Sequence, residues 1–141
     1  MVVRKVSDGF LVRLNKGELI MESLIELCRQ KDIKSGWVTG LGGTLWSELA
    51  YYSLDEKRYE FDRFDEKQEI SNLSGNIAFD KNGPAIHLHA TLSDENYHAY
   101  AGHLKEAAVG GTCELYVRVF KQPVERIHNA EVGLKLIDLD G

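Results

Sequence analysis

The sequence predicts an α+β fold, with a mainly antiparallel sheet of about seven strands and one main helix packed on one face. Segments rich in strand-forming residues follow one another through short turns, and short connections join antiparallel neighbours. Only one segment has a clear helical pattern of apolar residues. The other face of the sheet therefore lacks a helix to cover it, which makes another copy of the chain a reasonable cover.

The first expected elements are a strand and the main helix. Residues 10–14 alternate apolar and polar side chains, as a half-buried strand does. Residues 18–31 carry apolar side chains, among them Ile20 and Leu24, at helical spacing on one face. The acidic Glu18 suits the positive end of that helix dipole.

The rest of the chain is expected to be mostly strands. Residues 37–46 mix strand formers with glycines, so we expect a strand, a glycine bend or bulge, and then a second strand over residues 48–53. Residues 104–108 are expected to form a helix or a loop. Further strands are expected at residues 59–64, 68–79, 85–91, 114–120 and 133–139.

The bulk composition indicates one cytoplasmic domain that spans residues 1–141. The net charge of −5, from 17 basic and 22 acidic residues, argues against non-specific nucleic-acid binding, which depends on an excess of Lys and Arg. We find neither a signal peptide nor the ~20 apolar residues of a membrane helix. The two cysteines, Cys28 and Cys113, are expected to be reduced and structural.

Three histidines form the most informative pattern. Side chains alternate along a strand, so His87 and His89 should point to the same side, next to one another. If the chain returns beside this strand after residue 97, His103 could join them. Three imidazoles with an open fourth position are typical of zinc. The alternative is that these histidines only form hydrogen bonds across strands or between subunits. His98 is expected to be exposed and, like His128, has no role that the pattern supports.

Other motifs do not predict a site. Gly40 to Gly43 invites comparison with a dinucleotide-binding loop, but Leu45 stands where the third glycine would be, and no helix clearly follows. Cys113 has no neighbour in sequence that would lower its pKa. Ser74 lacks the motif that surrounds a serine nucleophile. The sequence thus assigns no catalytic residue and no organic cofactor.

Five segments together resemble the PPC ("plants and prokaryotes conserved") domain family, over almost the whole chain. The specific part is His87-Leu88-His89-Ala90-Thr91-Leu92-Ser93-Asp94 followed by Ala101-Gly102-His103-Leu104. The other segments are Gly40-Leu41-Gly42-Gly43, Leu73-Ser74-Gly75-Asn76-Ile77 and Glu114-Leu115.

The resemblance implies a largely antiparallel α+β fold that assembles as a homotrimer. It also favours a metal at His87, His89 and His103, with zinc as the expected ion. Plant members carry DNA-binding AT-hooks before this domain, and stand-alone prokaryotic members are often labelled as DNA-binding proteins by that association. This chain has no Arg-Gly-Arg-Pro hook and no basic tail, which argues against direct DNA binding.

The sequence therefore favours an assembly and binding module over an enzyme. A trimer would offer a cleft lined by the histidines for a metal, a small molecule or a partner protein. The alternative is a metal-dependent enzyme that acts on a small molecule, with Glu114 or Asp94 as the general acid or base. DNA binding through a local basic patch is the third hypothesis.

Overall fold

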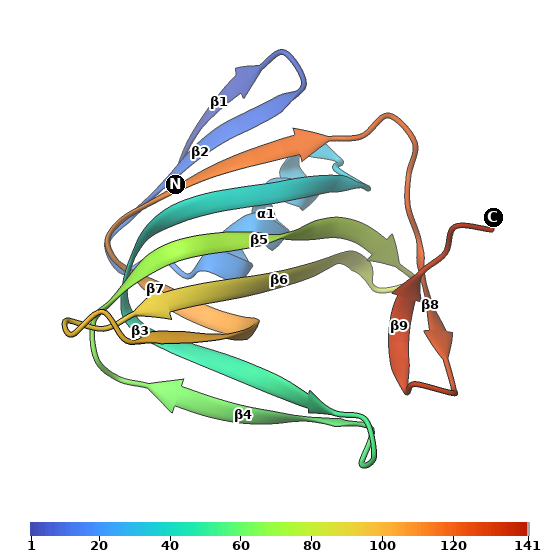
Figure 1. Ribbon diagram of the computed structural model, residues 1–141. Coiled ribbons are helices and arrows are strands. Elements are labelled where there is room, and N and C mark those ends of the chain that lie inside the picture. The colour runs from blue at the N-terminus through green and yellow to red at the C-terminus, as the bar shows by residue number, and fades with distance from the viewer. Residues whose placement is uncertain (141) are drawn as a thin grey trace.

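Figure 1 shows the computed structural model of the chain, which describes residues 1–140. Within these residues, seven strands form one sheet in the order β1-β2-β7-β6-β5-β3-β4, and β8 and β9 form a separate hairpin. The elements are β1 (Val2–Val6), β2 (Gly9–Asn15), α1 (Ile20–Lys31), β3 (Gly36–Ser53), β4 (Arg58–Phe64), β5 (Gln68–Asp80), β6 (Gly83–Ser93), β7 (Ala99–Val119), β8 (Arg126–Asn129) and β9 (Leu134–Ile137).

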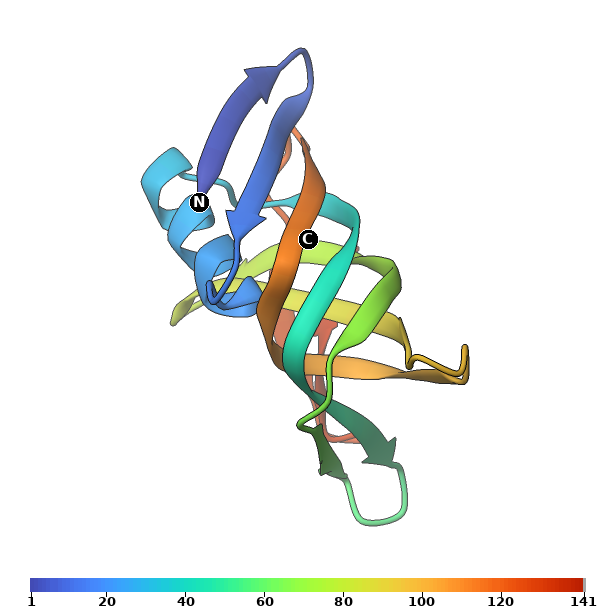
Figure 2. The same ribbon diagram turned by 90° about the vertical axis from the view of Figure 1, so that its left-hand side faces the viewer.

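The main sheet curves back on itself. All of its strand pairs are antiparallel, and β3 pairs with β5, β5 with β6, β6 with β7, and β7 again with β3. Two long strands, β3 with 18 residues and β7 with 21, make this circuit possible because each pairs with different neighbours along its length. Figure 2 shows the resulting twist, with the single helix on one side. The predicted fold class is confirmed.

The glycines of β3 form the expected bulge. The pairing of β3 with β5 shifts register between Gly40 and Gly42, and a Cβ added at Gly42 would lie 2.2 Å from the carbonyl oxygen of Thr112. Only glycine therefore lets β7 approach this closely. The strand continues through the bulge to Ser53, whereas the sequence predicted two separate strands.

The helix packs its apolar face on β6 and β7. Ile20, Leu24 and Leu27 are fully buried in the core. The N-cap residue, Leu19, has no side chain that could cap the helix. Glu106 of β7 caps the helix instead. The Glu106 carboxylate accepts hydrogen bonds from the backbone N–H groups of Met21 (2.8 Å) and Glu22 (3.2 Å).

The prediction of a helix or loop at residues 104–108 is wrong. These residues belong to β7, with Leu104 and Ala107 buried in the core and with backbone pairing to β3. The segment is rich in helix formers, but packing in the sheet overrides that local preference. The sequence also gave no indication of β1 or β8, and β9 is shorter than the expected strand at 133–139. Within residues 1–140, no helix has the length and apolar character needed to span a bilayer.

Candidate metal centre

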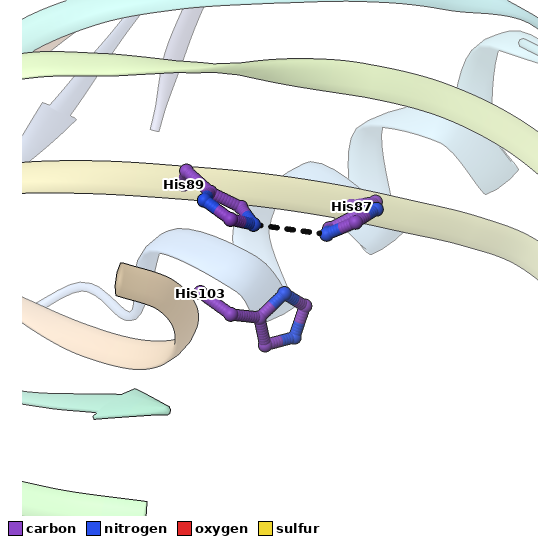
Figure 3. A group of neighbouring side chains, drawn as sticks. All are labelled: His87, His89 and His103. Carbon is purple, nitrogen blue, oxygen red and sulfur yellow. Dashed lines mark hydrogen bonds between the residues drawn. The ribbon is translucent and has the colours of Figure 1, made fainter. Parts of the chain in front are cut away.

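The two strands β6 and β7 bring all three predicted histidines together. His89 stands directly opposite His103 in the antiparallel pair, and His87 lies two residues away on the same face of β6. The intervening Leu88 is fully buried in the core. One ring nitrogen from each of the three histidines lies within 4.8 Å of the other two. Figure 3 shows the rings converging on one space beside β6.

The rings contact one another closely. The Nε2 atoms of His87 and His89 are 3.2 Å apart, and the ring centroids of His87 and His103 are 4.8 Å apart. Tyr59 of β4 stacks on His103 with 4.6 Å between ring centroids, which fixes the plane of that imidazole. The cluster therefore combines an exposed ring at His89 with two partly buried rings at His87 and His103.

The environment keeps two of the imidazoles neutral. Burial lowers the pKa of His87 to about 4, with the charges of Arg126 and His89 acting in the same direction. Burial also lowers the pKa of His103 to about 4, assisted by the other two histidines. A metal ligand must be a neutral imidazole. These two side chains therefore meet that condition at neutral pH without a pKa change.

An orphaned nitrogen also fits a metal site. Nδ1 of His103 is buried and has no hydrogen-bond partner among the described residues. Buried polar atoms nearly always have a partner, so this nitrogen needs an occupant or a ligand. Three imidazole nitrogen donors suit zinc, which accepts imidazole at three positions and leaves the fourth open.

Further polar groups border the cluster that the sequence did not indicate. Asn76 of β5 stands opposite His87. Arg126 of β8 donates a hydrogen bond from Nη2 to the Asn76 side-chain oxygen (2.7 Å) and lies 3.4 Å from Nδ1 of His87. Its Nη1 donates to the carbonyl oxygen of Lys135 (2.6 Å). No spacing rule connects these residues to the histidines, because Arg126 begins a separate hairpin that a loop joins to the end of β7.

The remaining candidates lie elsewhere. His98 is exposed, as predicted, and contacts Asp94 at 3.3 Å, while His128 is exposed on β8. Glu114 lies on the exposed sheet face beside Leu41, so neither proposed acid or base adjoins the histidines. The two cysteines are free and buried, and burial raises the pKa of each thiol to about 12.

The fold and the histidine cluster together define a small α+β protein whose sheet carries a metal-competent site. The chain belongs to the Plants and Prokaryotes Conserved (PCC) domain family, whose model matches residues 1–121. The predicted family is thus confirmed. The hairpin β8–β9 lies beyond the matched residues.

Solved structures support the same assignment. A candidate DNA-binding protein from Bacteroides thetaiotaomicron is 31% identical, with 99% of this chain and 98% of that chain covered and a TM-score of 0.96. A metal-containing protein from Archaeoglobus fulgidus is 28% identical (96% and 97% covered, TM-score 0.85). A plant- and prokaryote-conserved protein from Pyrococcus horikoshii is 25% identical (98% and 97% covered, TM-score 0.86). A comparison with curated proteins found no match.

Proposed function

We propose that this chain is a metal-binding, self-assembling module in which His87, His89 and His103 hold one zinc ion. The single observation that carries this proposal is the convergence of three ring nitrogens within 4.8 Å from two paired strands. The low pKa values of His87 and His103 and the orphaned Nδ1 of His103 support it. The similar protein from Archaeoglobus fulgidus is named as metal-containing.

The chain's own residues prepare the site for a ligand. Tyr59 holds the ring of His103, and the pairing of His89 with His103 fixes the separation of their strands. A bound zinc ion would act as a Lewis acid and offer its fourth position to a small ligand or water. Because Glu114 and Asp94 lie away from the cluster, binding is better supported than catalysis by these two carboxylates.

Metal analysis tests the zinc proposal directly. We expect the purified wild-type chain, after incubation with zinc and desalting, to retain about one zinc ion per chain, as a three-histidine site would. The His89→Ala variant should lose most of it. His98→Ala is the matched control, because His98 is exposed and lies outside the cluster. Equal zinc content in wild type and His89→Ala would refute the proposal.

Self-assembly, with a homotrimer as the expected form, is supported by the sheet face opposite α1. Leu11, Trp37 and Leu41 are 50%, 43% and 58% exposed there. Leu11 of β2 and Leu41 of β3, on the two sides of β7, line a shallow hollow of about 690 Å³. Contiguous exposed apolar side chains of this kind mark interaction surfaces.

Sedimentation equilibrium tests the assembly. We expect a trimer at micromolar concentration, and Leu41→Glu should shift the protein toward monomer by placing a charge in the apolar face. Lys34→Glu, which changes an exposed residue off that face, should leave the trimer intact. A monomeric wild type would refute self-assembly.

DNA binding is the second candidate, because two similar structures, from Bacteroides thetaiotaomicron and Ralstonia eutropha, are named as candidate DNA-binding proteins. The net charge of −5 opposes it. A gel-shift titration at low salt decides: a complex whose affinity falls steeply with salt would support DNA binding, and no shift would exclude it.

A further inference from the structure

A hollow of about 500 Å³ adjoins the histidine cluster on the side of the β8–β9 hairpin. His87, His103, Tyr59 and Arg126 line its polar part. Its remaining wall is mostly apolar and comes from β6 and β9: Ala85, Ile86, Leu134, Leu136 and Ile137. Figure 1 shows the hairpin beside the end of the sheet where β5 and β6 meet. The walls of the hollow therefore come partly from the matched residues 1–121 and partly from the hairpin beyond them.

Arg126 places a positive charge in this hollow without a counter-charge. Its Nε atom is buried and has no hydrogen-bond partner within residues 1–140, and no carboxylate in that range lies within ion-pair distance of the guanidinium. Lys135, the other cation of the lining, already pairs with Asp80. The lining contains no acidic side chain. Arg126 is partly buried, and a partly buried guanidinium without a carboxylate partner is a favourable place for an anion.

A metal ion bound by the histidines would further favour an anion in the hollow. Three neutral imidazoles leave the two positive charges of zinc uncompensated, and the Arg126 guanidinium stands beside one of those imidazoles. A guanidinium matches a carboxylate with paired donors, and carboxylate oxygens are also zinc ligands. The apolar wall suits a short hydrocarbon body better than the fully solvated oxygens of inorganic phosphate.

We propose that the hollow binds a small carboxylic acid with a short apolar chain, whose carboxylate lies between Arg126 and the open position of the metal site. This inference rests on the proposed zinc site and adds the class of ligand. It makes Arg126 a ligand-binding residue rather than a metal ligand. It also predicts reciprocal coupling: because Arg126 repels the metal ion when no anion is present, the carboxylate should strengthen zinc binding.

The experiment uses the full chain loaded with zinc, with isovalerate as the probe in isothermal titration calorimetry. Isovaleramide has nearly the same shape without the charge, and inorganic phosphate has the charge without the apolar body. Arg126→Gln removes the guanidinium and Arg126→Lys keeps a positive charge. Arg29→Gln, an exposed arginine on α1, is the matched control. Zinc content and thermal unfolding are measured for each variant.

We expect wild type and Arg29→Gln to bind isovalerate at least tenfold more tightly than isovaleramide or phosphate. Arg126→Gln should bind isovalerate at least tenfold more weakly with its zinc content unchanged, and Arg126→Lys should bind with intermediate affinity. Added isovalerate should also slow zinc loss to a chelator in wild type but not in Arg126→Gln.

Two results separate the two proposals. If zinc is retained and Arg126→Gln binds isovalerate as tightly as wild type, or if isovaleramide binds wild type equally well, the carboxylate inference is overturned and the zinc site stands. If the chain retains no zinc but still binds isovalerate through Arg126, the zinc proposal fails and the anion site stands. Should Arg126→Gln fail to fold, the comparison of isovalerate with isovaleramide on wild type still decides.

Discussion

Alternate side chains of β6 and β7 point to opposite faces of the sheet, and the two faces differ in composition. Toward α1, Leu88, Leu92 and Leu104 are at most 1% exposed and belong to the apolar core. On the other side of the same strands, the three histidines converge beside polar groups and an unpaired arginine. Because a strand alternates its side chains between two faces, neighbouring residues can serve stability and ligand binding separately.

This comparison teaches that the core supports the histidine cluster without including it. Changes on the core side should lower the free energy of unfolding. Changes on the histidine side should lower metal affinity and leave the fold in place. The following predictions test that separation, beginning with the largest expected effect.

The largest effect is expected at Leu88, between the two histidines of β6. Leu88→Ala should lower the free energy of unfolding by about 2–5 kcal/mol, because it leaves a cavity under α1. Urea unfolding in the presence of a chelator measures this loss. The folded fraction should still bind zinc with wild-type stoichiometry. A loss below about 1 kcal/mol would mean that this side of β6 is not the core.

The opposite pattern is expected at His103. His103→Gln should weaken zinc binding by about 100-fold or more, because one of three ligands is lost. Competition with a chromophoric chelator measures the affinity. The metal-free variant should unfold within about 1 kcal/mol of wild type, since the lost contact is a stacked ring pair with Tyr59. Unchanged zinc affinity would contradict the proposal that His103 is a zinc ligand.

A smaller effect is expected at Glu106, the acceptor for the first N–H groups of α1. Glu106→Ala should destabilise the fold by about 1 kcal/mol, as the loss of a helix cap does. Zinc affinity should not change. Glu26→Ala, on the exposed side of the same helix, is the control and should have little effect. Equal effects of the two substitutions would show that Glu106 does not cap α1.

The last prediction concerns the pH dependence of stability. In the metal-free chain the pKa of His103 is about 4, below the usual 6.5, so the folded state resists protonation. The unfolded state gains that proton as pH falls below 6.5, and the free energy of unfolding should therefore fall between pH 6.5 and 4. Urea midpoints across this range should show a shallower fall for His103→Gln. Identical slopes would mean that burial does not depress this pKa.

The parts of the site predicted from sequence are those fixed by local spacing. His87 and His89 share a face because they are two residues apart on one strand, and the family motif indicated His103. The pairing of His89 with His103 depends on β7 starting where it does, which spacing alone left open. The run Leu104 to Ala108 suggested a helix or loop because its residues favour helices, and only the pairing of β7 with β3 makes it a strand.

Arg126 and Glu106 could not be found from sequence for a related reason. Arg126 reaches Asn76 across 50 residues, and Glu106 reaches Met21 across 85. No periodicity or motif encodes such contacts, because they depend on how the sheet folds back on itself. Local sequence patterns predicted the fold class and the candidate histidines. The polar groups around those histidines could be identified only in the tertiary structure.

X-ray absorption spectroscopy of the zinc-loaded protein tests the central claim most directly. The account predicts three imidazole nitrogens at about 2.0–2.1 Å from zinc, with one further light-atom ligand. His89→Ala should lose one imidazole from that shell or lose the metal. A sulfur shell near 2.3 Å, or a first shell of water oxygens without the scattering pattern of imidazole, would contradict it.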